Sequence, residues 1–319
     1  MSIQKIFKNK IQATADCFKK VFEVNGRYVN DHCFITHNDE IHLFYIDGET
    51  GKGCYDLENE IIIGHAVSKD LSYWEEKKPA LIYDKSLYFE ERGIFAPYVY
   101  EKEGRFYMFY SSHNFNKAQF MCLAFSDNLY EWTRYDNNPL FRPSQGWSLW
   151  KENIPCSCRD PHIFHDEDKD EYVMLWVADM LENPKMSCIA ASVSKNLFSW
   201  REAGPVLIRE HSFYESITCK TESPCLLKKD NLYYLFYRHG NGTKYCISDS
   251  YTNFTYSDSY YLSPSHASEI FKFKDYWYIS SCSRAVADIE HKTDRSMGLF
   301  LAKLAWDGLH PEIYAFSQQ

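Results

Sequence analysis

Three acidic side chains stand at comparable places in the sequence, each just before a segment with the pattern of a β-hairpin. They are Asp31, Asp160 and Glu222, and the hairpins that follow are expected over residues 34–45, 162–176 and 225–237. Carboxyl groups can act as nucleophile, general acid or general base when one is ionised and another is protonated. Because the three expected strands are equivalent, we expect these carboxyl groups to converge on one site.

The elements that would position them recur along the chain. Five expected hairpins have second strands at residues 42–45, 106–110, 173–176, 234–237 and 277–280, and a third strand follows each hairpin. An aromatic fraction of 17% also favours strands over helices. A repeat of this size predicts an all-β fold, a five-bladed β-propeller, whose innermost strands line a central channel.

The first residues follow a different pattern. Apolar side chains such as Ile3, Phe7, Ile11 and Phe18 recur mostly four apart with lysines between them, which predicts an amphipathic helix over residues 3–22. We therefore expect an N-terminal helical segment (residues 1–24) that caps a propeller domain (residues 25–319). No C-terminal β-sandwich is expected.

Composition argues against several classes of function. A net charge of -9 and the lack of a basic run argue against a nucleic-acid partner. No stretch approaches 18 apolar residues and the N-terminus lacks a secretory pattern, so we expect no membrane partner and a cytoplasmic location. The 11 cysteines form no regular framework, and Cys156 and Cys158 lack the two-residue gap of metal motifs. Reduced thiols, no metal and no cofactor are therefore expected.

Three convergent carboxyl groups suit the hydrolysis of a glycosidic bond, which needs one protonated and one ionised carboxyl group. The short side chain of Asp31 suits a fixed nucleophile, and the longer Glu222 can reach the leaving-group oxygen. Burial and neighbouring negative charge are expected to raise the pKa of Glu222 toward neutrality. Asp160 can accept hydrogen bonds from ring hydroxyls and hold the sugar in a distorted shape.

Four motifs, in order, resemble those of glycoside hydrolase family 32, the invertases, inulinases and other β-fructosidases. They are Asn30-Asp31 leading to His42-Leu43-Phe44-Tyr45, then Gly64-His65-Ala66-Val67-Ser68 with Trp74, Arg159-Asp160-Pro161 and Glu222-Ser223-Pro224. The resemblance covers roughly residues 28–285. It implies that Asp31 is the nucleophile, Asp160 the transition-state stabiliser and Glu222 the acid/base.

Two features depart from that family. His32-Cys33-Phe34 replaces the Pro-Asn-Gly that follows the first family aspartate, so the floor of the sugar subsite differs. The expected lack of a β-sandwich is instead similar to family 43, which contains inverting arabinofuranosidases, arabinanases and xylosidases. The resemblance therefore leaves open whether the sugar is fructosyl, arabinosyl or xylosyl, and whether its configuration is retained or inverted.

Other residues are expected to line the pocket and bind substrate. Aromatic rings there would stack on sugar faces, and the candidates are Asn30, Phe95, Trp147, Trp150, Arg159 and His266. Three residues are expected to be structural because they stand at the far ends of their hairpins: His113, Arg238 and His239. Three tryptophans recur at one place in the repeat and predict packing between blades: Trp74, Trp132 and Trp200.

The leading hypothesis is an exo-acting glycosidase on a small furanoside, fructosyl or alternatively arabinosyl. Its partner would be a small oligosaccharide or glycoside. A non-catalytic sugar-binding propeller is an alternative, and so is glycosyl transfer or phosphorolysis, which an anion site of Arg and His near Glu222 would indicate. The sugar, the linkage and the oligomeric state stay open.

Overall fold

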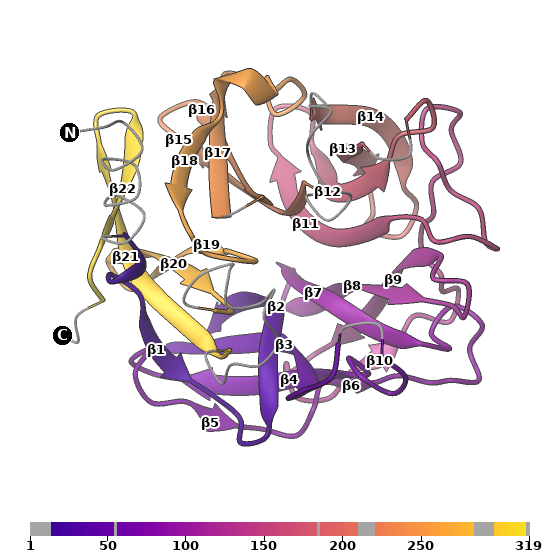
Figure 1. Ribbon diagram of the computed structural model, residues 1–319, viewed down its shortest axis with the longest axis horizontal. Coiled ribbons are helices and arrows are strands. Elements are labelled where there is room, and N and C mark those ends of the chain that lie inside the picture. Colours follow the sequence, from indigo (N-terminus) through magenta and orange to yellow (C-terminus); the bar gives the residue numbers. More distant parts are fainter. Residues whose placement is uncertain are drawn as a thin grey trace.

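The computed structural model describes residues 14–53, 56–183, 186–209, 221–240, 242–283 and 297–316. Within these ranges the chain forms five antiparallel β-sheets that surround a common centre (Figure 1). The predicted all-β fold and five-bladed propeller are therefore confirmed. None of the helical residues described belongs to a segment long and apolar enough to cross a membrane.

Each of the first four blades is built from consecutive strands. Blade one contains β2 (Arg27–His37), β3 (Glu40–Glu49), β4 (Ile62–Ser68), β5 (Glu75–Glu76) and β6 (Leu81–Ile82). Blade two contains β7 (Gly93–Lys102), β8 (Arg105–His113), β9 (Gln119–Ser126) and β10 (Thr133–Arg134). Blade three contains β11 (Cys158–Asp166), β12 (Glu171–Asp179), β13 (Ser187–Ser194) and β14 (Arg201–Ile208). Blade four contains β15 (Glu222–Lys229), β16 (Leu232–His239), β17 (Gly242–Ser248) and β18 (Tyr260–Ser263), with the 3₁₀ turn η1 (Tyr256–Asp258) before β18.

The fifth blade combines strands from both ends of the chain. Its inner strands are β19 (Ile270–Phe273) and β20 (Tyr276–Ser281), followed by β21 (Leu299–Asp307). Both β1 (Lys19–Phe22) and β22 (His310–Tyr314) pair with β21, in its first and second halves respectively. Figure 1 shows indigo β1 beside yellow β21. The fifth blade thereby joins the N-terminal strand to the C-terminal ones and closes the ring.

The helix predicted over residues 3–22 is wrong at its C-terminal end. Residues 3–13 lie outside the described part of the chain, and Lys19–Phe22 form strand β1 of the fifth blade. The Phe22 side chain is buried, and its ring lies 5.5 Å from that of Tyr45 in blade one. Pairing with β21 and packing between blades therefore outweigh the helical spacing of the local sequence.

The recurring tryptophans do pack between blades, as predicted. The indoles of Trp74, Trp132 and Trp200 each donate to the carbonyl oxygen three residues earlier, at 3.0–3.1 Å. The ring of Trp132, in blade two, lies 5.4 Å from Phe44 of blade one. The ring of Trp200, in blade three, lies 5.8 Å from Phe109 of blade two. One turn with one tryptophan thus supports successive interfaces.

A β-bulge interrupts the innermost strand of each of the first four blades. The regular pairing breaks between Val29 and His32, Phe95 and Tyr98, Arg159 and His162, and Glu222 and Cys225. Left-handed φ values accompany the bulges in blades two to four, at Ala96, Asp160 and Ser223, and Ala267 has one in blade five. A bulge bends its strand and redirects side chains, so these positions aim toward the centre of the ring.

Candidate active site

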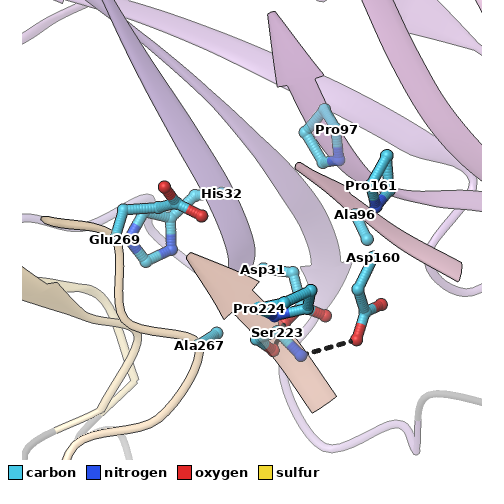
Figure 2. A pocket seen from close by; sticks show the side chains of 10 residues that line it. All are labelled: Asp31, His32, Ala96, Pro97, Asp160, Pro161, Ser223, Pro224, Ala267 and Glu269. Carbon is cyan, nitrogen blue, oxygen red and sulfur yellow. Dashed lines mark hydrogen bonds between the residues drawn. The ribbon is translucent and has the colours of Figure 1, made fainter. Parts of the chain in front are cut away.

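A pocket opens at the centre of the propeller, where these bulges meet. About 280 Å³ of space lies within it, part of which is open to solvent. Its lining residues come from all five blades: Asp31, His32, Ala96, Pro97, Asp160, Pro161, Ser223, Pro224, Ala267 and Glu269 (Figure 2). Two of the three acids predicted to converge are among them, and Glu222 adjoins the lining residue Ser223.

The three acids occupy neighbouring positions of the repeat, not identical ones as expected. Asp160 is the first bulge residue of its strand, and Asp31 is the second bulge residue of β2. Glu222 precedes its bulge and still pairs with Arg238 of β16. The three carboxyl groups therefore approach the pocket from different positions along their inner strands, which gives each a different environment.

Ser223 joins the two aspartates. Its hydroxyl donates to Asp31 Oδ1 at 3.2 Å, and its backbone N–H donates to Asp160 Oδ2 at 2.9 Å (Figure 2). The Asp160 backbone N–H in turn donates to Ser111 Oγ at 3.1 Å. Carboxylates from blades one and three thus meet on a serine of blade four, so the predicted convergence is correct.

Two arginines hold Glu222. Arg238 Nη1 lies 2.7 Å from Glu222 Oε1, and Arg159 Nη2 lies 3.1 Å from Oε2. Arg159 Nε is also 3.5 Å from Asp160 Oδ2. Arg159 thus contacts two of the three acids. The expected location of Arg238, at the far end of its hairpin from the acids, is wrong, because the end of the second strand of an antiparallel hairpin returns to the start of the first, where Glu222 lies.

Burial and neighbouring charges shift the pKa values of the three acids in different directions. Burial, with the negative charges of Asp160, Glu222 and Glu60, raises the pKa of Asp31 well above its usual range. Burial likewise raises the pKa of Asp160 to about 6, against the opposing effect of Arg159. Burial acts the same way on Glu222, but Arg238 and Arg159 outweigh it and lower its pKa. The expectation of a raised Glu222 pKa is thus wrong for this substrate-free geometry.

Asn30 lies beside a fourth carboxylate at the site. Its amide Nδ2 donates to Glu60 Oε1 at 3.3 Å, and the Tyr28 hydroxyl donates to the same oxygen at 2.8 Å. Glu60 is buried and adds to the negative charge that acts on Asp31. It belongs to the β3–β4 connection, on the same side of blade one as the start of β2. No motif marks it, and only this loop position could have indicated it.

The aromatic residues predicted to stack on sugar are placed differently from one another. Phe95 adjoins the lining residue Ala96 and packs against Ile46. Trp150 packs in the core between blades, and its indole donates to the Gln119 carbonyl at 2.7 Å. The Trp147 ring lies 5.9 Å from buried Trp176. Neither tryptophan lines the pocket, because the loop before β11 packs them against blades two and three.

His266 lies on the side of the pocket that holds Glu222 and Arg238. Its side chain is buried, which lowers its pKa to about 4, and the charges of Arg238 and Glu222 act on it. Within the described residues its Nδ1 atom has no hydrogen-bond partner. His113, expected to be structural, packs its ring 5.5 Å from Phe95. The site thus contains two guanidinium groups and one neutral imidazole around Glu222.

The sequence as a whole matches one family. Residues 22–271 match the description "Glycosyl hydrolases family 32 N-terminal domain". The chain belongs to glycosyl hydrolase family 32. A curated relative, the extracellular exo-inulinase of Aspergillus awamori, is 26% identical over 256 residues, which are 71% of this chain and 43% of the inulinase. The family 32 chain therefore spans less than half the length of this relative.

Solved structures share the fold at low identity. The sucrose-6-phosphate hydrolase of Lactobacillus gasseri superimposes with a TM-score of 0.72 at 17% identity, over 99% of this chain and 67% of the hydrolase. A Bombyx mori family 32 β-fructofuranosidase gives 0.70 at 16%, over 98% and 68%. A family 43 enzyme (GH43_1) of Xanthomonas citri gives 0.64 at 16%, over 97% and 96%. The fold is thus common to families 32 and 43, and only the sequence match distinguishes them.

Proposed function

We propose that this family 32 chain is a β-fructofuranosidase-type glycosidase that removes a terminal fructosyl unit from a small glycoside with retention of configuration. Glu222 would donate a proton to the leaving-group oxygen while the Asp31 carboxylate attacks the anomeric carbon and forms a glycosyl ester. Glu222 would then accept a proton from water, whose oxygen displaces Asp31. Asp160 would accept hydrogen bonds from ring hydroxyls in both transition states.

The observation that carries the proposal is the meeting of the Asp31 and Asp160 carboxyl groups on Ser223, one residue after Glu222. Several carboxyl groups buried together repel one another when ionised, and clusters with such perturbed pKa values are common at functional sites. Both aspartates line the pocket, whose lining residues come from all five blades. Family membership makes glycoside hydrolysis the chemistry that this cluster suits best.

The charge pattern adds one requirement to the mechanism. In the substrate-free pocket the arginines favour ionised Glu222, while burial favours protonated Asp31. Catalysis needs the opposite arrangement with the same number of protons. Sugar hydroxyls that donate to Asp31 and Asp160 stabilise their ionised forms, so we infer that substrate binding transfers a proton from the aspartates to Glu222.

Two substrates that differ in leaving group test these roles. Asp31→Ala is expected to lower kcat/KM at least about 10³-fold on both a nitrophenyl and a methyl β-fructofuranoside. Glu222→Gln is expected to lower it about 10²–10⁴-fold on the methyl glycoside and far less on the nitrophenyl one, whose leaving group needs no protonation. Asp168→Asn, at an exposed hairpin turn in blade three, is the matched control and should act as wild type.

Three results would contradict parts of this proposal. Full activity of Asp31→Ala would exclude its role as nucleophile. An inverted anomer as first product, read by NMR, would favour the inverting chemistry known for family 43. Tight binding of fructosides without turnover by the wild-type chain would favour a sugar-binding propeller, and a panel of arabino- and xylo-configured nitrophenyl glycosides would test the sugar.

A second candidate function is phosphorolysis in the same pocket. Arg159, Arg238 and His266 gather around Glu222, and this alternative requires an anion site of Arg and His at that place. Phosphate would replace water as the acceptor and leave as a glycosyl phosphate. Addition of inorganic phosphate to the nitrophenyl reaction, followed by ³¹P NMR, would show this product. Free sugar as sole product at saturating phosphate would exclude it.

A further inference from the structure

A second cluster of ionisable side chains lies in the propeller centre and takes no part in the proposed reaction. His162 of β11, Cys225 of β15 and Glu269, which precedes β19, belong to blades three, four and five. Each offers one ligand atom, and these atoms all lie within 4.8 Å of one another. Three adjacent inner strands therefore bring a nitrogen, a sulfur and a carboxylate oxygen to one point.

The environment of His162 leaves one of its ring nitrogens without a partner. The Nε2 atom lies 3.2 Å from the Leu226 carbonyl oxygen and 3.1 Å from the Leu226 backbone nitrogen, which fixes the ring. The Nδ1 atom is buried, and the described residues supply no hydrogen-bond partner for it. A buried nitrogen left in this way is destabilising unless a ligand occupies it.

The other two side chains of the cluster differ in exposure. Cys225 is 1% exposed, whereas Glu269 is partly exposed and lines the pocket (Figure 2). Cys33 and Tyr98 also lie close enough to Glu269 for its charge to act on them. No lysine or arginine is among the groups that act on Glu269. Burial raises the pKa of Glu269 to about 8, and a side-chain hydrogen bond with Cys225 acts in the opposite direction.

We propose that His162, Cys225 and Glu269 bind a zinc ion. Zinc accepts imidazole, thiolate and carboxylate ligands, whereas calcium and magnesium prefer oxygen ligands alone. A tetrahedral zinc site separates its ligand atoms by about 3.5 Å, so small side-chain rotations suffice to close the present triangle. With Nδ1 bound to the metal, Nε2–H of His162 would donate to the Leu226 carbonyl oxygen, as is usual for metal-bound histidines. The fourth ligand would be a water molecule in the channel.

Such an ion would join three blades at their centre. Its ligands would come from β11, from β15 and from the residue before β19. These strands belong to three separate sheets. The proposal is independent of the glycosidase function, because it concerns side chains that the reaction does not use. Metal binding can therefore be measured whether or not the protein hydrolyses fructosides.

The test titrates the chelator-treated full-length protein with Co²⁺ and with Zn²⁺. We expect one Co²⁺ per chain, with a near-ultraviolet charge-transfer band from the thiolate and visible bands typical of tetrahedral cobalt. Stoichiometric Zn²⁺ should displace the cobalt and raise the melting temperature. The protein as purified should contain close to one zinc by elemental analysis.

Single variants identify the ligands. Cys225→Ser should abolish the thiolate band, and Glu269→Gln should weaken Co²⁺ binding by about 100-fold. Cys188→Ala, at a buried cysteine of β13 outside the cluster, should leave both unchanged, with circular dichroism to verify folding of every variant. Failure of the wild-type protein to bind Co²⁺ with micromolar affinity would overturn the proposal. An unchanged thiolate band in Cys225→Ser would overturn it as well.

Discussion

Glu222 is the residue whose charge state decides how the proposed site works. Its carboxylate forms ion pairs with Arg238 and Arg159, and these favour its ionised form before substrate binds. An acid that must donate a proton is thus held by two groups that oppose protonation. The effect of each arginine on the pKa of Glu222 can be measured by substitution of that arginine.

Removal of one arginine should shift the pH dependence of activity. Without the positive charge of Arg238, the ionised form of Glu222 is less favoured and its pKa rises, so the acid stays protonated to higher pH. Arg238→Met is therefore expected to move the basic limb of the kcat/KM profile upward by about one pH unit. The measurement is the pH profile on the methyl glycoside. Arg142→Met, at a half-exposed surface residue, should leave the limb in place, and a downward shift in Arg238→Met would contradict the argument.

At this scale the sequence predicted residue types better than contacts. The three acids and Arg159 were identified from motifs. The contacts that Ser223, Glu60 and Arg238 make at the site were not predicted, because they depend on which atoms meet in the folded chain. Arg238 could have been found from the antiparallel register alone, since the end of β16 pairs with the start of β15. Ser223 required the bulge, which turns its hydroxyl toward Asp31.

At the scale of the element, the β-bulge brings residues at the start of an inner strand into the central pocket. Ala96 occupies the bulge of blade two with a φ of 47° and is 4% exposed. Left-handed backbone is unfavourable for side chains, and most of all for β-branched ones. This blade lacks an acid at the bulge, yet it keeps the same backbone shape.

Substitutions at Ala96 should separate backbone strain from chemistry. Ala96→Val is expected to lower the free energy of unfolding by about 1–3 kcal/mol, through strain and crowding. Ala96→Gly should change it by less than about 1 kcal/mol, because relief of strain offsets the greater freedom of the unfolded chain. Urea unfolding measures both. Equal stability of the two variants would show that the bulge conformation imposes no constraint there.

The hairpins, which have strong local sequence patterns, were predicted well. Strand β1, which forms by pairing with a strand distant in sequence, was not predicted. The five hairpins follow from alternating apolar residues and turn clusters, which are local properties. Strand β1 instead owes its conformation to β21, about 280 residues away in the sequence. Its spacing of apolar residues fits a helix, and nothing nearby reveals the partner. The bulges likewise left no signal beyond the prolines that follow Ala96, Asp160 and Ser223.

The whole molecule depends on the interface between its first and last blades. Phe22 of β1 lies at this junction, with its ring 5.5 Å from Tyr45 and 6.3 Å from Trp74. The rings of Phe34 in β2 and Phe271 in β19 stack 4.1 Å apart at the same junction. Aromatic packing across this interface therefore takes the place of a covalent closure.

Truncation of the Phe22 side chain should lower the stability of the whole propeller. Phe22→Ala is expected to lower the free energy of unfolding by about 3 kcal/mol, because it leaves a cavity between blades five and one. Calorimetry or urea unfolding would measure this change. Tyr73→Ala, at a surface ring that is 75% exposed, should have little effect. A similar small effect for Phe22→Ala would show that β1 is not needed for closure.

The buried charges of the pocket should reduce stability at neutral pH. Because the pKa of Asp160 is about 6 when folded and its ordinary value is 3.8, the folded protein binds more protons between these values, and stability falls as pH rises from about 4 to 6. Asp160→Asn removes this titration and should unfold at higher temperature than wild type at pH 7, with a smaller difference at pH 4. It should also be inactive. A melting temperature at pH 7 below that of wild type would contradict this account.

The pairing of β1 and β22 with the same strand, β21, has a further consequence for how the chain could be reconnected. Tyr314 of β22 pairs with Lys303, and Lys19 of β1 pairs with Leu301, so the two strands run end to end along one edge of β21. The Phe316 backbone N–H donates to the Cys17 carbonyl at 3.1 Å. In a variant that keeps only residues 17–316, a linker of a few residues between Phe316 and Cys17 would therefore join β22 and β1 into one continuous strand. The propeller is thus suited to circular permutation, with new ends placed in any exposed hairpin turn while the central pocket stays intact.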